Sequence, residues 1–319
     1  MGLGCMNLSH AYGIPPSSED GLAVLRTALD DGVTHLDTAT LYGAGRNEEL
    51  VGQALRGRRD EVMLASKGGM AMVEGTKVID GRPDTLRAQV DASLSRLGVD
   101  HIDLYYLHRW DKKVPIEESV GALASAVEQG KIGAIGLSEV SVATLRKAQQ
   151  AAPIAAVQNE YSLWSRNPEL GMLDVTAADG IALVAFSPVA RGFLSDSVGD
   201  PADLAEKDIR RSMPRFSAQN WPANEALLPA WRGLAAEAEC TPAQLALVWL
   251  LSRGEHVVPI PGTTSVSHLR EDFGALDLSV DAALLARAGE LISTATVAGP
   301  RYAPGPAAEV DAETFEADA

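Results

Sequence analysis

The sequence predicts an α/β protein built as a single-domain (β/α)8 barrel of the TIM type. Eight short apolar or β-branched runs alternate with longer helical patterns, and the alternation begins almost at the first residue. Because βα units wind with one hand, eight of them close into a parallel barrel. The alternative, a doubly wound open sheet, requires a glycine-rich dinucleotide fingerprint after an early strand, and the run GLGCMN lacks its third glycine.

The expected strands and helices follow one another in pairs. The strands cover residues 3–6, 34–37, 62–66, 102–107, 134–137, 156–158, 182–186 and 257–259. The helices cover residues 19–31, 47–55, 84–97, 116–129, 142–150, 169–178, 224–238 and 242–252, and a further helix at 267–274 follows the last strand. Thr241 and Pro242 suit an N-cap and the first position of a helix, and left-handed helix ends are expected at glycines 32, 98, 130 and 254.

Two segments fall outside the alternation. Residues 195–222 form an irregular, charged stretch that is too long for an ordinary βα loop, and we expect it to act as a lid. From residue 298 the composition turns to Pro, Gly, Ala and acidic residues. We therefore predict a barrel over residues 1–297 and a mobile acidic C-terminal tail over residues 298–319.

The overall composition favours small-molecule chemistry. The 319 residues include 27 basic and 43 acidic ones, and the resulting net charge of −16 repels nucleic acids and anionic membranes. The two cysteines, Cys5 and Cys240, have no metal-ligand spacing and suit a reducing compartment. No secretion signal or long apolar run is present in the sequence. We expect a cytoplasmic protein with no bound metal, no membrane partner and no nucleic-acid partner.

Four polar residues stand at or just beyond the ends of predicted strands, where a barrel of this type carries its active site. They are Asp37, Tyr42, Lys67 and His108. Taken singly, the Asp is a typical loop cap, the Lys a solvated charge and the His a packing residue. Together they form a proton-transfer device, in which Lys67 lowers the pKa of Tyr42 and Asp37 keeps Lys67 charged.

Seven motifs then follow one another in a characteristic order. They are GVTHLDTATLYGAGRNEELVGQAL, LASKGG, GVDHIDLYYLHRWD, GKIGAIGLSE, VQNEYSLW, LVAFSPVARGFL and VVPIPGTTSVSHLRED. Over nearly its whole length the sequence resembles the aldo-keto reductase superfamily. The runs GLSE, SLWSR and DIRRSMPRF resemble most its branch of auxin-induced-like and pyridoxal reductase-like proteins.

The resemblance implies a reaction and a set of roles. The protein would be an NAD(P)H-dependent enzyme that reduces aldehydes or ketones to alcohols. Asp37, Tyr42, Lys67 and His108 would form the catalytic tetrad. Tyr42 would be the general acid that protonates the carbonyl oxygen, and His108 would orient the carbonyl group, while the cofactor supplies hydride.

The resemblance also implies contacts for the nicotinamide and the pyrophosphate. Ser138 and Gln158 would hydrogen-bond the carboxamide, and Phe186 would stack on the ring. Glu139 stands where many members have Asn, and Phe186 stands where they often have Tyr. The pyrophosphate would lie on the run after the seventh strand, at Ser187, Arg191, Gly192 and Leu194.

The adenosine phosphate would lie on the loop after the eighth strand and at the start of the next helix. The candidate residues are Gly262, Thr263, Thr264, Ser265, His268 and Asp272. Many members carry Lys, Arg and Asn where this chain has Gly262, His268 and Asp272. We therefore expect NADP as the cofactor, with NADPH preferred over NADH by less than in members with those basic residues.

The substrate and two other functions stay open at this level. Trp110 is the first candidate for a substrate contact, because it follows His108 by two residues, and Trp164 and Trp221 are further candidates that could equally be packing residues. A nicotinamide-binding regulatory subunit with little turnover would share the barrel and the tetrad, and turnover with simple aldehydes distinguishes it from an enzyme. A Schiff-base aldolase using Lys67 would need an uncharged amine, and borohydride trapping would detect it.

Overall fold

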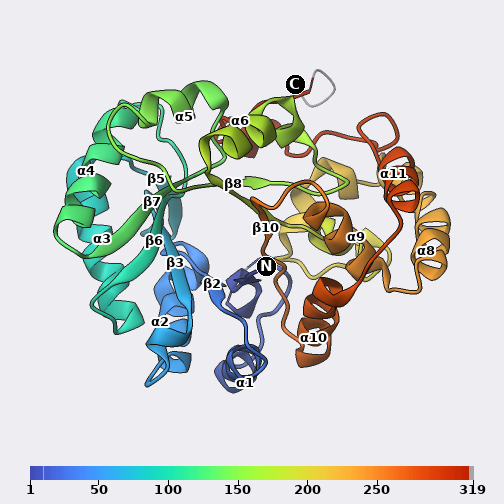
Figure 1. Ribbon diagram of the computed structural model, residues 1–319, viewed down its shortest axis with the longest axis horizontal. Coiled ribbons are helices and arrows are strands. Elements are labelled where there is room, and N and C mark those ends of the chain that lie inside the picture. Colours follow the sequence, from blue (N-terminus) through green and yellow to red (C-terminus); the bar gives the residue numbers. More distant parts are fainter. Residues whose placement is uncertain (10, 316–319) are drawn as a thin grey trace.

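Eight parallel strands form one sheet that curls round a central axis, with helices outside it (Figure 1). The structure is a computed structural model, and it describes residues 1–9 and 11–315. The strands pair in the order β1-β2-β3-β6-β7-β8-β9-β10. Their bounds are β1 Leu3–Gly4, β2 His35–Asp37, β3 Met63–Gly68, β6 Ile102–Leu107, β7 Ile132–Ser138, β8 Ala156–Glu160, β9 Ala182–Phe186 and β10 Val257–Pro259.

The sheet closes on itself where the last strand meets the first. The backbone amide of Gly2 donates to the carbonyl of Pro259 at 3.0 Å, and that of Gly4 donates to Pro261 at 2.9 Å. These bonds join the two edges, so the predicted (β/α)8 barrel is confirmed.

The outer helices cover the sheet in chain order. Helices α1 to α6 are Ser18–Asp30, Arg46–Ala54, Pro83–Leu97, Ile116–Glu128, Val142–Ala148 and Met172–Asp179. Helices α7 to α12 are Trp221–Glu225, Leu228–Glu237, Pro242–Leu251, Val266–Gly274, Ala282–Leu291 and Pro304–Ala307. The signals at Thr241 and Pro242 are confirmed, because the Thr241 side chain accepts from the Gln244 amide within a capping box at the start of α9.

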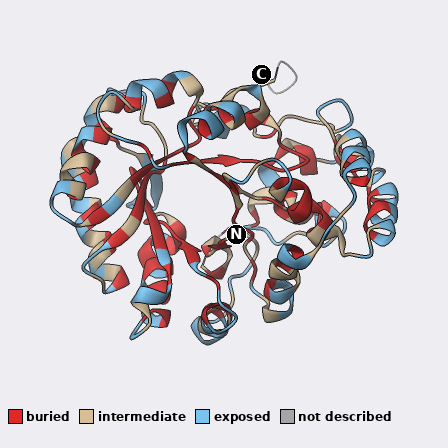
Figure 2. Cartoon of the chain, viewed as in Figure 1, coloured by how far each residue is buried: buried red, intermediate tan, exposed pale blue. Residues whose placement is uncertain are grey.

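The core has two layers, and Figure 2 shows strands that are buried along most of their length and helices that are buried on their inner sides. One layer fills the barrel interior with Ala65, Leu104, Tyr106, Ala156, Val184 and Ile260. A larger apolar layer lies between the strands and the helices. This division follows from parallel strands that are covered on both faces.

One predicted helix is wrong, and the structure contains elements that were not predicted, among them α11 and a hairpin. The single helix predicted over 224–238 is two helices, α7 and α8. Pro229 has no amide to donate to an earlier turn, so it breaks a continuous helix, but it is tolerated in the first turn of α8. A hairpin of β4 (Met70–Val73) and β5 (Thr76–Ile79) was not predicted. Its turn, Glu74 and Gly75, has two positive φ angles, as tight hairpins require.

The segments outside the alternation contact the barrel. In the predicted lid, the amide of Ile209 donates to the carbonyl of Ala11 at 3.0 Å, across the loop after β1. In the C-terminal segment, Arg301 is buried and Asp311 and Glu313 accept hydrogen bonds from the start of α5. Lid closure, tail mobility and the division at residue 297 stay predictions. None of the helices in the described ranges has the length and apolar character needed to cross a bilayer.

Candidate active site

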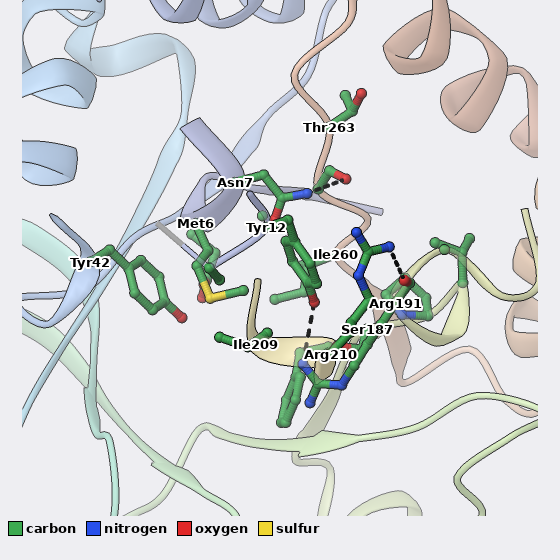
Figure 3. A pocket seen from close by; sticks show the side chains of 18 of the residues that line it. Met6, Asn7, Tyr12, Tyr42, Ser187, Arg191, Ile209, Arg210, Ile260 and Thr263 are labelled. Carbon is green, nitrogen blue, oxygen red and sulfur yellow. Dashed lines mark hydrogen bonds between the residues drawn. The ribbon is translucent and has the colours of Figure 1, made fainter. Parts of the chain in front are cut away.

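A cavity of about 470 Å³ opens at the carboxyl ends of the strands. It runs from Tyr42 and His108, past Phe186, to Thr264, which precedes α10, and Asp272, which lies on α10. Figure 3 shows side chains that line it, from Tyr42 in the loop after β2 to Thr263 in the loop after β10. The long shape allows one ligand to contact several strand ends at once.

The four tetrad candidates meet at one end of this cavity. Asp37 is the last residue of β2, and Lys67 lies on the neighbouring strand β3 with its side chain fully buried. The Lys67 ammonium forms an ion pair with Asp37 and donates to the Tyr42 hydroxyl at 3.3 Å. The rings of Tyr42 and His108 lie edge to face with centroids 5.8 Å apart. Asp37, Tyr42 and His108 line the cavity, and Lys67 lies behind them.

The turn that carries Tyr42 is held by two buried polar residues of α2 that sequence reasoning missed. Asn47 accepts from the Thr38 hydroxyl at 2.6 Å and donates to the Cys5 carbonyl at 2.8 Å. Glu48 accepts from the Ser66 hydroxyl at 2.6 Å. Polar side chains on the inner face of a helix were the available signal, because such groups are buried only when they are hydrogen-bonded.

The electrostatics of the tetrad differ in part from the sequence prediction. Burial raises the pKa of Tyr42 above its usual value, and Lys67 opposes this shift. Burial also lowers the pKa of Lys67, but Asp37 and Tyr42 outweigh burial and the net pKa is raised. Lys67 is therefore an ammonium at neutral pH, and Tyr42 keeps its proton.

Ser138 and Gln158 line the cavity beside the tetrad. The Gln158 amide donates to Asp37 at 2.8 Å, which links β8 directly to the tetrad candidates. The Ser138 hydroxyl accepts from Arg109 at 3.1 Å. Both side chains come from neighbouring barrel strands, so the barrel fixes their positions relative to Asp37.

The end of β9 supplies Phe186 to the cavity, and the loop after it supplies Ser187, Arg191 and Gly192. Gly192 has φ 95°, and a Cβ there would lie 2.9 Å from the Ser197 hydroxyl, so only glycine suits this close turn. The Arg191 guanidinium donates to Glu160 at 2.8 Å. It also donates to the Tyr12 hydroxyl at 3.2 Å (Figure 3). The positive charge of Arg191 is thus largely matched by a buried carboxylate.

The far end of the cavity is lined by Gly262, Thr263, Thr264, His268 and Asp272. A Cβ at position 262 would lie 2.8 Å from the Gly4 carbonyl oxygen, so the barrel wall leaves no room for a side chain. Burial, together with the nearby Glu271, raises the pKa of Asp272 to about 7.

Besides Lys67, which lies behind the wall, three predicted site residues are not among the described residues that line the cavity, namely Leu194, Ser265 and Trp110. Leu194 is fully buried. Ser265 is the N-cap of α10. The Trp110 indole donates to the Val114 carbonyl at 2.9 Å.

Packing explains the two remaining tryptophan candidates. Trp164 stacks on Phe193 with ring centroids 4.2 Å apart, and Trp221 stacks on Phe216 at 5.7 Å. The structure adds lining residues that sequence reasoning did not single out, among them Lys77, Arg109, Arg210 and Tyr302. Arg109 alone had a local signal, its place directly after His108.

A closed parallel barrel whose strand ends gather Asp37, Tyr42, Lys67 and His108 round a long cavity defines a class of barrel oxidoreductases. The profile described as the aldo/keto reductase family matches residues 1–292. The chain belongs to this family. The resemblance noted in the motifs is therefore confirmed.

Individual relatives cover nearly the whole chain. It is 41% identical to the aldo-keto reductase yakc of Schizosaccharomyces pombe, whose name includes NADP(+), over 98% of this chain and 94% of that protein. It is 42% identical to a probable aldo-keto reductase of Glycine max over 95% and 88% of the two chains. Among solved structures, a glycerol dehydrogenase from Gluconobacter oxydans superposes with a TM-score of 0.84 at 27% identity, over 95% of this chain and 93% of that one. An aldo/keto reductase from Klebsiella pneumoniae in complex with NADP and acetate superposes with a TM-score of 0.71 at 26% identity, over 98% and 94%.

Proposed function

We propose that this protein reduces aldehydes or ketones to alcohols with NADPH, and that Tyr42 is the general acid. The observation that carries the proposal is the buried series Asp37, Lys67 and Tyr42, whose phenol faces the cavity beside His108. This series keeps an acid protonated at neutral pH and places a positive charge where a negative charge develops. The NADP-linked relatives support the choice of cofactor.

The cavity fits an extended dinucleotide. Gly192 and Gly262 line the cavity without side chains, so a ligand can approach the backbone closely there. Phe186 offers an aromatic face between these glycines and the tetrad, and α10 begins at the far end. Exposed amides at a helix start favour a phosphate there. We assign the nicotinamide half to Ser138, Gln158 and Phe186, and the phosphates to the loops after β9 and β10.

When bound, the cofactor supplies a hydride to the carbonyl carbon. Tyr42 donates its proton to the carbonyl oxygen, which gives the alcohol product and leaves Tyr42 as a phenolate. The Lys67 ammonium, 3.3 Å from the Tyr42 hydroxyl oxygen, stabilises the phenolate, and Asp37 balances the charge of Lys67. His108 meets the ring of Tyr42 edge to face and is placed to orient the carbonyl group.

A Schiff-base aldolase is disfavoured by the environment of Lys67. Its amine is fully buried, paired with Asp37 and raised in pKa, so it is not the neutral nucleophile that such a mechanism needs. A regulatory nicotinamide-binding protein differs from the proposed enzyme by its turnover.

The variant Tyr42→Phe tests the proposal. Turnover of a panel of simple aldehydes with NADPH should fall about 10²-fold or more, because the phenolic proton is lost, while NADPH still binds. NADPH affinity is measured by quenching of tryptophan fluorescence. Wild-type turnover in Tyr42→Phe contradicts the assigned acid, and a wild-type protein that binds NADPH without reducing any aldehyde supports the regulatory alternative.

A further inference from the structure

The C-terminal strap, defined as residues 298–315, contacts the corner between β7 and α5. Asp311 accepts from the amide and the hydroxyl of Ser141, and Glu313 accepts from the Val142 amide at 2.6 Å. The side chain of Asn167 donates to the Glu313 carbonyl at 2.9 Å. These acidic residues therefore satisfy the free amides at the start of α5.

Within this corner the strap contacts both the backbone and the side chain of Glu139. The Glu139 carbonyl accepts from the Asp311 amide at 3.0 Å, and its carboxylate forms a buried ion pair with Arg301. Glu139 has φ 55°, a left-handed conformation that a non-glycine residue adopts when its surroundings impose it. The strap supplies two of the contacts that impose it.

Glu139 in turn connects the two strands, β7 and β8, that carry Ser138 and Gln158. It directly follows Ser138, and its amide donates to the Gln158 carbonyl at 3.0 Å. Its carboxylate accepts from the Glu160 amide at 2.7 Å. The positions of Ser138 and Gln158 thus depend on the geometry of Glu139, although the Glu139 side chain points away from the cavity toward Arg301.

Arg301 also contacts the second buried carboxylate of this region. Its Nε lies 3.2 Å from Glu160, which is paired with Arg191 and accepts from the Tyr302 hydroxyl at 3.1 Å. Arg301 is 6% exposed, so loss of its charge would leave Glu139 and Glu160 as buried carboxylates with less compensation. We expect the left-handed turn to relax in that case.

The nicotinamide half must lie at this end of the cavity. Hydride and proton go to adjacent atoms of one carbonyl group, and Tyr42 delivers the proton, so the ring lies next to Tyr42. Gln158, bonded to Asp37 at 2.8 Å, and Ser138 are the polar residues there that the strap positions.

We propose that Arg301 is a positioning residue for the nicotinamide half of the cofactor site, acting through Glu139 on Ser138 and Gln158. This inference rests on the proposed function. It makes the C-terminal strap part of the cofactor site, and it separates the strap's effect on the nicotinamide from any effect on the adenosine end near α10.

The test compares two probes on the full chain. NADPH carries the nicotinamide, and adenosine 2′,5′-bisphosphate carries only the adenosine end. In Arg301→Gln the dissociation constant for NADPH should rise about tenfold or more, while that for the bisphosphate stays within about twofold of wild type. Arg301→Lys keeps the charge and should recover part of the loss. Arg287→Gln, which breaks an exposed pair with Glu237, is the matched control and should change neither constant.

A double-mutant cycle keeps the test valid if one variant is unstable. Glu139→Gln combined with Arg301→Gln removes both charges, and its loss of NADPH affinity should be no larger than that of Arg301→Gln alone, because the pair acts as a unit. Unchanged NADPH affinity in Arg301→Gln, or equal weakening of both probes, overturns the inference and leaves the proposed function standing. Failure of the wild-type protein to bind NADPH overturns both.

Discussion

Lys67 lies fully buried between a carboxylate and a phenol, and both partners affect its charge. Asp37 and Tyr42 raise its pKa against the effect of burial, and Lys67 in turn opposes the upward shift of the Tyr42 pKa. The ammonium therefore limits how far burial raises the pKa of Tyr42. The proposed mechanism needs protonated Tyr42, so the rate of carbonyl reduction should fall as pH rises through the Tyr42 pKa.

Replacing Lys67 with Met should move the basic limb of the pH profile for kcat/KM to higher pH and slow turnover. The largest influence that lowers the Tyr42 pKa is lost, so deprotonation requires a higher pH. Initial rates of NADPH oxidation across the alkaline range measure the shift. Lys131→Met breaks an exposed pair with Asp91 and should leave the profile unchanged. An unmoved basic limb in Lys67→Met would contradict the assigned role.

Cofactor preference should change at His268 and not at Gly262. Position 262 has no room for a side chain, whereas His268 is exposed at the start of α10. His268→Arg should raise kcat/KM for NADPH about two- to fivefold and leave NADH nearly unchanged, because an exposed charge pair adds a modest attraction for the 2′-phosphate. Arg270 already pairs with Asp31. Equal gains with both cofactors would show that position 268 does not face that phosphate.

At the scale of elements, the barrel depends on helices whose N-termini are capped by side chains of neighbouring residues. In α9 the Thr241 hydroxyl accepts from the Gln244 amide, and the Gln244 side chain accepts from the Thr241 amide at 3.1 Å. This helix is apolar on nearly every side and precedes β10, the strand that completes the barrel. Its N-terminus therefore affects both packing and closure.

Thr241→Ala should lower the free energy of unfolding by about 1 kcal/mol, because the N-cap acceptor is lost. Urea unfolding followed by circular dichroism measures the change. Thr241→Ser keeps the hydroxyl and should stay close to wild type. A loss of equal size in both variants would indicate that the methyl group, and not the cap, stabilises this end of α9.

For the whole molecule, buried carboxylates affect stability in opposite directions with pH. Burial opposes ionisation of Glu160, but Arg191, Arg301 and Arg215 outweigh it and lower the pKa to about 2, so the stability that Glu160 adds is lost only in strong acid. Asp272 behaves in the opposite way. Its folded pKa of about 7 lies above the usual value of 3.8, so its cost to stability grows as pH rises between these values.

Asp272→Asn should therefore reduce the loss of stability between pH 5 and pH 8. The neutral amide has no charge to bury, so the melting temperature at pH 8 should rise by about 2 °C or more relative to wild type, with a smaller change at pH 5. Thermal unfolding at both values of pH measures this. Asp277→Asn, an exposed change nearby, should alter neither value. Equal shifts at both values of pH would rule out ionisation of Asp272 as the cause.

Local patterns were sufficient to predict the barrel and to single out the four tetrad candidates that the structure brings together. The strands Ile102–Leu107, Ala182–Phe186 and Val257–Pro259 match their predicted bounds, because short apolar runs between helices identify buried parallel strands. Asp37 and His108 were identified because each stands where such a run ends. The predicted sign of Lys67's effect on Tyr42 also holds, but the net pKa of Tyr42 depends on burial, which a sequence does not show.

Contacts between distant parts of the chain required the tertiary structure. Arg301 and Glu139 are 162 positions apart, and the ion pair between them exists only because the C-terminal strap returns to the end of β7. The same holds for Gly262, whose lack of space comes from the Gly4 carbonyl across the barrel closure. Hydrophobic period and strand-end chemistry are local properties that one segment carries alone. Burial, ion pairing and steric room at a site depend on which segments the closed barrel brings together.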